Sequence, residues 1–190
     1  GADTITGDGG IDTITGGGGA DVITGGAGAD VITGGAGADD FVYLLTADLF
    51  DSNTTVDTSL AGGAGTDELL VGTTGTAFAI AATDAWAGIT TVETITAVAN
   101  SVAVSITLAQ TAATAGITTV DISLADSDNN GSNIIDISAF TGSGATTLTG
   151  ADGATTNTIT GAGGIDTITG GAGVDTITGA AGADVIDGGA

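Results

Sequence analysis

Residues 16–33 read GGGGADVITGGAGADVIT, two copies of one nine-residue pattern that joins a glycine-rich stretch to a short apolar one. Glycine reaches backbone angles that residues with a Cβ avoid, so the first half of the pattern predicts a sharp turn. The second half is rich in β-branched residues and predicts a short strand. Side chains alternate along a strand, so we expect Asp30 and Ile32 to face one side and Val31 the other. The pattern therefore predicts alternating turns and strands, with the acid and the apolar side chain both pointing inward.

The same nonapeptide fills both ends of the chain. It recurs through residues 1–42 and again through residues 161–190, with one Asp every nine residues. Self-similarity at a fixed period indicates a repeat fold whose units stack on their neighbours. The repeated acids are Asp3, Asp12, Asp21, Asp30, Asp39, Asp166, Asp175 and Asp184.

Two nonapeptides are expected to form one coil with a strand on each side, and successive coils would stack in parallel about 4.8 Å apart. Asp3, Asp21 and Asp39 would then line one edge of the stack, and Asp12 and Asp30 the other. Carboxylates at this spacing repel each other strongly unless a cation lies between them. Calcium is the natural ion, because it takes about 6–8 oxygen ligands and needs neither His nor Cys.

The predicted ligands of several calcium ions are the repeated Asp side chains and the backbone carbonyls of the glycine-rich turns. Those carbonyls belong to Gly7, Gly9, Gly16, Gly18, Gly25, Ala27, Gly34, Ala36, Gly161, Gly163, Gly170, Ala172, Gly179, Ala181, Gly188 and Ala190. Three further candidates stand outside the regular pattern. Asn157 takes the place of an acid, Asp8 takes the place of a second glycine, and Asp67 ends an isolated GGAGTD.

The charge balance of the 190-residue chain is extreme, with 23 acidic residues, no Lys, Arg or His, and a net charge of −23. A compact state of such a chain repels itself unless cations from solution enter it. Binding to nucleic acid depends on Lys and Arg and is not expected. Direct membrane insertion is not expected either, because no run is long and apolar enough to span a bilayer. The absence of Cys excludes disulfides and thiolate metal sites.

Catalysis is not expected. General acid–base and nucleophilic sites draw mainly on His, Cys, Lys or Arg, and all four are absent. A carboxylate pair that cleaves sugars needs two acids in different environments, whereas a metal-filled row makes its acids alike.

These nonapeptides resemble those of the RTX (repeats-in-toxin) family, whose G-G-x-G-x-D-x-U-x sequence forms a calcium-loaded parallel β-roll. The resemblance covers the two ends of the chain. It implies secretion, often by a one-step export route, and calcium-triggered folding outside the cell. The departures from the family pattern are few: Asp8, Ala162 and Ala180 replace the second glycine of their repeats.

Between Tyr43 and about Ala154 the nonapeptide is lost, but short Thr-rich strands separated by Gly, Asn or Asp continue. We therefore expect an all-β fold, a parallel β-solenoid with RTX rolls at residues 1–45 and 155–190 and an irregular β-solenoid at residues 46–154. The central part resembles bacterial surface-layer proteins of the RTX type.

The sequence also predicts several local features of the centre. A bulging loop is expected around residues 47–59 and one short helix within residues 107–116. The acid-rich stretch 126–136 has the start of an EF-hand loop but no closing Glu, which favours a solvated turn over a calcium site. The aromatic residues expected in the core are Tyr43, Phe78, Trp86 and Phe140.

The two ends of the chain are in phase with each other. Written before a second copy, Asp184 and the Asp3 that follows it are nine residues apart, so the repeat continues across the junction. This predicts head-to-tail contact between copies, either within a longer tandem chain or through calcium and strand pairing alone. The expected interface residues are Asp175, Asp184, Gly188, Ala190, Gly1, Asp3 and Asp12.

Two functions remain open on the sequence. One is an extracellular, calcium-stabilised structural protein that builds a filament or surface array. The other is a stalk or ligand-binding segment of a large secreted RTX adhesin, in which outward Thr side chains contact a surface, ice or a glycan. The Thr residues expected to face outward at the N-terminal end are Thr4, Thr6, Thr13, Thr15, Thr24 and Thr33.

Overall fold

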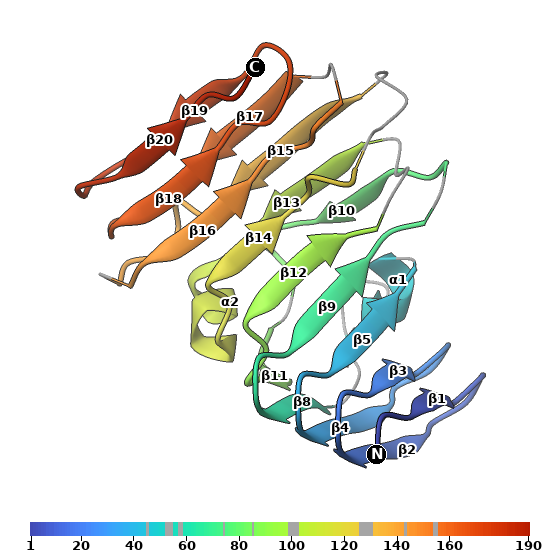
Figure 1. Ribbon diagram of the computed structural model, residues 1–190. Helices are drawn as coiled ribbons and strands as arrows, with labels where there is room; N and C mark the ends of the chain where they lie inside the picture. The colour runs from blue at the N-terminus through green and yellow to red at the C-terminus, as the bar shows by residue number, and fades with distance from the viewer. Residues whose placement is uncertain are drawn as a thin grey trace.

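The computed structural model describes residues 1–44, 46–51, 55–56, 59–73, 75–84, 86–98, 103–125, 131–142, 144–153 and 156–190. Over these residues the chain forms a parallel β-solenoid, as predicted, with its two termini at opposite ends of the stack (Figure 1). The chain passes back and forth between two walls, and the paired strands within each wall run parallel.

One wall is a single sheet of nine strands that runs the whole length of the molecule (Figure 1). In spatial order its strands are β1 (Thr4–Thr6), β3 (Val22–Thr24), β5 (Asp40–Tyr43), β9 (Glu68–Val71), β12 (Thr94–Ala97), β14 (Thr119–Asp121), β16 (Thr146–Thr149), β18 (Asp166–Thr169) and β20 (Val185–Asp187). All three predicted segments contribute to this wall, and the boundaries drawn between them stay a prediction.

The other wall is divided into two sheets. The sheet of four strands contains β2 (Thr13–Gly18), β4 (Val31–Ala36), β8 (Ser59–Ala64) and β11 (Ile89–Thr90). The sheet of five strands contains β10 (Phe78–Ile80), β13 (Val104–Thr107), β15 (Ser132–Asp136), β17 (Thr156–Thr160) and β19 (Thr176–Thr178). The division falls within one coil, where β11 pairs with β8 and β10 pairs with β13.

Coil length distinguishes the ends from the centre. Thr4 pairs with Val22, a spacing of 18 residues or two nonapeptides, and β18 and β20 pair at the same spacing. Asp40 pairs with Glu68, a spacing of 28 residues. The predicted two-nonapeptide coil is therefore confirmed at both ends, and the longer, irregular coils expected in the centre are also present.

Two insertions leave the regular coils. α1 (Thr46–Leu49) and the antiparallel pair β6 (Phe50–Asp51) and β7 (Thr55–Val56) occupy the expected bulge, whose other residues lie outside the described ones. α2 (Gln110–Ala115) confirms the expected short helix. Residues 126–130, the first part of the acid-rich stretch, also lie outside the described residues, and its last part forms β15. Neither helix, nor any other in the described chain, is long and apolar enough to cross a membrane.

The core is a thin stack of apolar side chains between the two walls. Each strand of the nine-stranded sheet places one apolar residue on that of the next strand. Those at most 1% exposed are Ile23, Phe41, Leu69, Ile95, Val120, Leu148 and Ile168. Asp30 and Ile32 are buried while Val31 is 36% exposed, which confirms the predicted alternation. The four aromatic residues expected in the core, Tyr43, Phe78, Trp86 and Phe140, are all buried.

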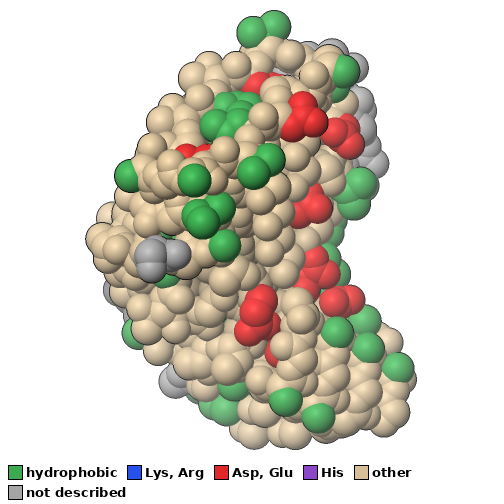
Figure 2. Space-filling view, turned by 60° about the vertical axis from the view of Figure 1, so that its left-hand side comes forward, with side chains coloured by type: hydrophobic (Ala, Val, Ile, Leu, Met, Phe, Trp, Pro, Cys, Tyr) green, Lys and Arg blue, Asp and Glu red, His purple; other side chains and the backbone are tan. Residues whose placement is uncertain are grey.

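The stack is open at both ends. Ile186 is 50% exposed, whereas Ile168, its neighbour in the adjoining coil, is 1% exposed. At the other end Ile5 is only partly buried. Figure 2 shows acidic side chains along the hollowed side of the molecule and no basic ones. The end coils thus present the same apolar and polar groups that hold one coil to the next.

Candidate metal centres

Hydrogen bonds link the repeated Asp residues along both edges of the solenoid. We name the positions at the start of the nine-stranded sheet's strands the first row, and those at the start of the divided wall's strands the second row. In the first row the N–H of Asp3 donates to Oδ1 of Asp21 (2.8 Å), and the N–H of Asp21 donates to Oδ1 of Asp39 (2.9 Å). In the second row the N–H of Asp12 donates to Oδ1 of Asp30 (2.9 Å). Each acid therefore uses one oxygen to hold the preceding coil.

The other carboxylate oxygen has no hydrogen-bond partner in several of these acids. Within the described chain, such buried Oδ2 atoms belong to Asp12, Asp21, Asp39, Asp67 and Asp175. Asp21 and Asp39 are at most 1% exposed. An ionised carboxylate buried without a partner is costly, so a positive group is needed beside it. The chain supplies no such side chain, since it lacks Lys, Arg and His.

A glycine keeps a space open beside each of these oxygens. A Cβ built on Gly16 would lie 2.5 Å from Oδ2 of Asp21 and 2.7 Å from the carbonyl oxygen of Gly34 in the next coil. A real Cβ does not fit so closely against two oxygens, so the position requires glycine. The other glycines of the nonapeptides with the same surroundings are Gly7, Gly34, Gly161 and Gly170.

The donor set of these spaces consists of oxygen atoms from two adjacent coils. No three carboxylates meet at one point in the part of the chain that the structure describes, so an ion here would rest on a few carboxylates and on backbone carbonyls. Calcium accepts such a set, whereas soft transition metals favour the His and Cys that this chain lacks. The geometry therefore fits calcium.

The two ends of the chain also match a known family. The model of the RTX calcium-binding nonapeptide repeat, in four copies, matches residues 1–32, 15–45 and 160–190. Both ends of the chain thus match the RTX calcium-binding repeat, which supports the resemblance to that family. Repeats of this kind are calcium-binding structural units, typically of secreted proteins. The match leaves out the centre, whose resemblance to surface-layer proteins stays a prediction. Neither the curated proteins nor the solved structures that were searched gave a match.

The predicted carbonyl ligands of the RTX ends fall into two groups. Those of Gly25, Gly34, Gly179 and Gly188 border the glycine spaces. Those of Ala27, Ala36 and Ala190 accept a backbone N–H from the adjoining coil. The other predicted positions lie in the same turns or at the ends of the strands before them. The carbonyl of the first glycine in a nonapeptide is thus the one that the fold brings beside the Oδ2 atom of a repeated Asp.

Asp8 and Asp184 illustrate two further positions in the RTX turns. Asp8 has a φ of 76°, so it takes a conformation that favours glycine, and its side chain is exposed. The Asp8 carbonyl accepts the N–H of Ala27 (2.9 Å). Asp184 accepts the N–H of Asp166 at Oδ1 (3.0 Å), and its Oδ2 lies beside Gly179.

Electrostatics indicates which acids resist ionisation. Burial raises the pKa of the Asp67 carboxyl above its usual value of 3.8; the N–H of Asp39 partly offsets this rise, and the charges of Asp39 and Glu93 add to it. Burial, followed by the charge of Asp39, also raises the pKa of Asp40. A bound cation would reverse this preference and hold the carboxylates ionised.

The centre of the second row has a different chemistry. Asn157, predicted as an irregular metal ligand, is 1% exposed, and its side-chain amide makes many hydrogen bonds. Its Nδ2 donates to the carbonyl of Gly170 (2.9 Å), to that of Ala151 (3.2 Å) and to Oδ1 of Asp175 (2.9 Å). Its Oδ1 accepts the N–H of Ala151 (3.2 Å) and the Nδ2 of Asn133 (3.3 Å). The side-chain oxygen of Asn157 therefore has partners, unlike Oδ2 of Asp21 and Asp39.

The first row is also joined by hydrogen bonds where the centre meets the C-terminal RTX end. Thr146 Oγ1 donates to Oδ1 of Asp166 (2.6 Å), and the N–H of Ala162 donates to Oδ2 of the same acid (2.9 Å). Asp166 thus has partners for both oxygens, although the nonapeptide predicts it as a ligand. The nonapeptide period gives no signal for Thr146, Asn133 or Glu93, because the coils that carry them have other lengths.

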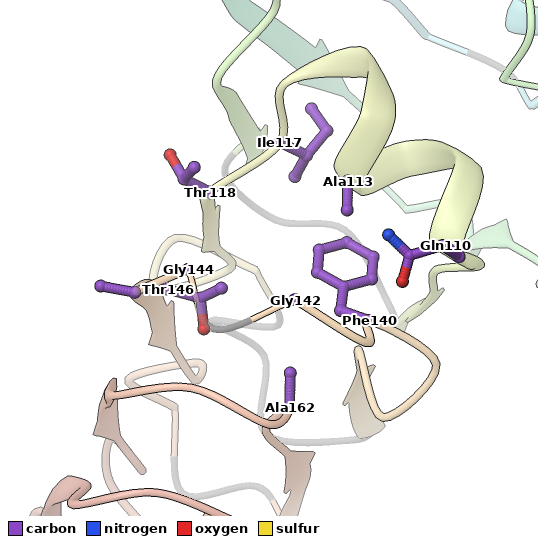
Figure 3. Close-up of a pocket in the computed structure, with 10 residues that line it drawn as sticks. Gln110, Ala113, Ile117, Thr118, Phe140, Gly142, Gly144, Thr146 and Ala162 are labelled. Carbon is purple, nitrogen blue, oxygen red and sulfur yellow. The ribbon is translucent and has the colours of Figure 1, made fainter.

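One pocket lies beside the first row, since Thr118 and Thr146 are among the residues that line it. It has a volume of about 250 Å³ beside α2 and is bordered by Ile117, Phe140 and Ala162 among others (Figure 3). Its Gln110 accepts hydrogen bonds from the N–H and Oγ1 of Thr141. The side-chain oxygen of Gln110 thus already has partners within the fold, and no ligand chemistry follows from it.

Proposed function

We propose that the protein is an extracellular, calcium-stabilised structural protein whose copies join head to tail through their RTX ends into a filament or surface array. The proposal rests on hydrogen-bonding groups of the two rows that have no partner at either end of the stack. Within the described chain no hydrogen-bond donor reaches Oδ1 of Asp3 or Asp12, while the N–H groups of Asp175 and Asp184 reach no acceptor. One end therefore offers acceptors and the other offers donors.

The repeat spacing aligns these groups. Within the molecule an RTX donor meets the acid 18 residues ahead, as Asp166 meets Asp184. For a copy placed directly after Ala190, the count from Asp175 to the next Asp3 is 15 plus 3, or 18. The count from Asp184 to the next Asp12 is 6 plus 12, again 18. These contacts can form whether consecutive copies are joined by a peptide bond or bind each other non-covalently.

Apolar groups at the open end support the same contact. Val185 and Ile186 are 62% and 50% exposed, although Ile186 stands at a core position of its strand. By the 18-residue spacing, Ile14 of a following copy would cover Ile186. Unpaired strands and apolar side chains at the end of a solenoid favour pairing with another copy, and a head-to-tail contact that does not close extends into a filament.

Electron microscopy of the purified chain, at millimolar calcium and after chelation, tests this proposal. We expect filaments that form with calcium and disperse without it, and monomers at millimolar calcium would overturn the proposal. Ile186→Asp places a charge on the open end and is expected to abolish filaments. Leu124→Asp, at a residue 57% exposed in the centre, is the matched control and should leave them intact.

A second function, a binding segment of a large adhesin, is favoured by the outer face of the nine-stranded sheet. Thr94 pairs with Thr119, Thr119 with Thr147, and Thr147 with Thr167, which places four Thr residues at matching positions of adjacent strands. A row of this kind suits contact with a regular surface such as ice or a glycan. Monomers that bind such a surface, and lose binding when Thr147 is replaced by Lys, would favour this function over assembly.

A further inference from the structure

The first row continues beyond the RTX repeats. Asp67 lies between β8 and β9, outside the matched residues. Its Oδ1 accepts the N–H of Asp39 (2.9 Å), and its own N–H donates to Oε2 of Glu93 (2.9 Å). These are the bonds that link consecutive acids of the RTX end. Asp67 therefore occupies the next position of the row, although its coil is longer than two nonapeptides.

The second oxygen of Asp67 borders a space like those of the RTX sites. Asp67 is 0% exposed, and within the described chain its Oδ2 accepts no hydrogen bond. A Cβ at Gly62 would overlap both this oxygen and the carbonyl oxygen of Thr91 in the next coil. A buried carboxylate oxygen and a carbonyl oxygen thus border one space that only glycine leaves open.

The far side of this space is built without a nonapeptide. Thr91 supplies the carbonyl where an RTX coil would use glycine, and its backbone has a φ of 51°. The Thr91 Oγ1 accepts the N–H of Gly63 (2.8 Å), which ties this turn to the glycine turn of the adjoining coil. The carbonyl of Gly62 in turn lies 2.6 Å from a Cβ built on Gly34, so this turn also completes the last RTX space.

We propose that Asp67 binds one further calcium ion, shared with the carbonyl of Thr91, and that this ion ends the N-terminal part of the first row. Glu93 is the last acid in this part of the first row, and its carboxylate accepts the N–H of Asp67. Thr118, at the next row position, adds no charge. The proposal rests on calcium binding by the RTX ends but not on the assembly of copies.

Counting bound ions by native mass spectrometry at saturating calcium tests the site. Asp67→Asn is expected to carry one calcium ion fewer per chain than the parent protein. Asp121→Asn, which changes a partly exposed acid on the same wall, is the matched control and should keep the parent count. An equal count in the parent protein and Asp67→Asn would overturn the proposal, whether or not the protein forms filaments.

Gly62→Ala provides a second test that leaves the acid and its charge in place. A methyl group would occupy the space, so this variant should also lose one ion, whereas Gly144→Ala, where a Cβ meets nothing within 4 Å, should lose none. In the unaltered protein, residues 59–71 should gain protection from hydrogen exchange when calcium is added. Exchange there that does not respond to calcium would contradict the site even if a variant failed to fold.

Discussion

The RTX ends and the centre of the solenoid use the same row positions with different chemistry. At the ends, Asp21 and Asp39 each use one oxygen to hold the preceding coil and leave the other buried without a partner. Just before the matched C-terminal repeats, Asn157 fills a row position with an amide whose oxygen and nitrogen both have partners. The nine-stranded wall and the core run through both regions without interruption. The need for a cation therefore depends on the row residue and on whether its second oxygen has a partner, not on the solenoid fold.

The amide of Asn157 explains how one coil can do without an ion. Its Nδ2 donates to the carbonyl of Gly170, the kind of first-glycine carbonyl that borders a space at the RTX ends. An N–H group thus supplies the positive partner there, and the side chain remains neutral. At an RTX coil the same carbonyl faces a carboxylate, and both need a cation from solution.

Removal of calcium should have the largest effect and should separate the two regions. At a free calcium concentration of 100 times its Kd, each site adds about 2.7 kcal/mol to the free energy of unfolding. Chelation is therefore expected to release the RTX ends, residues 1–44 and 160–190, while residues 103–125 stay protected. Hydrogen exchange followed by mass spectrometry measures this, and uniform loss of protection along the chain would contradict the comparison.

Gly16→Ala should damage one RTX coil through its calcium site. The new methyl would lie against Oδ2 of Asp21 and the carbonyl of Gly34, so the ion of that space is lost. We expect the free energy of unfolding in calcium to fall by about 2–3 kcal/mol, with a much smaller change in chelator. Urea unfolding measures both, and Gly144→Ala is the control. An equal loss with and without calcium would indicate a purely steric effect.

Asn157→Asp should convert a central row position into an RTX-like one. The carboxylate cannot donate to Gly170 or Ala151, so without calcium we expect a loss of about 1–3 kcal/mol. Calcium should restore most of this loss, and the ion count should rise by one. Asn157→Ala removes the same donors but offers no carboxylate, so calcium should not restore its stability. Thermal unfolding with and without calcium distinguishes the two variants.

The pH dependence of stability should be the smallest effect and should change sign with calcium. In chelator, Asp67, which lies outside the released ends, has a pKa raised above the 3.8 of the unfolded chain, so the folded state binds more protons in the window above 3.8. Stability is then lost as pH rises through that window and regained on acidification. With calcium, protons compete with the ion, and acidification from about pH 7 should lower stability. Urea midpoints along a pH series check both slopes.

The sequence predicts the ends of the molecule well because a nine-residue period fixes which side chains stack. It places Asp30 and Ile32 inside, pairs coils at 18 residues, and marks the glycines that border the metal spaces. It does not predict that Glu93 follows Asp67 in the first row, because coils of irregular length remove the period. The partners of Asn157 come from separate turns, so only the structure shows that hydrogen bonds within the chain satisfy its amide without a cation.

The first and last strands described, β1 and β20, both belong to the nine-stranded sheet. In the end coils consecutive strands alternate between the walls, so in the proposed filament β1 of a following copy would continue the wall of β19. Each copy would then be rotated by half a revolution about the fibre axis relative to the one before. The hollowed sides would point in alternate directions, and their curvatures would cancel. A curved subunit would in this way build a straight fibre with twofold screw symmetry and an axial repeat of two copies.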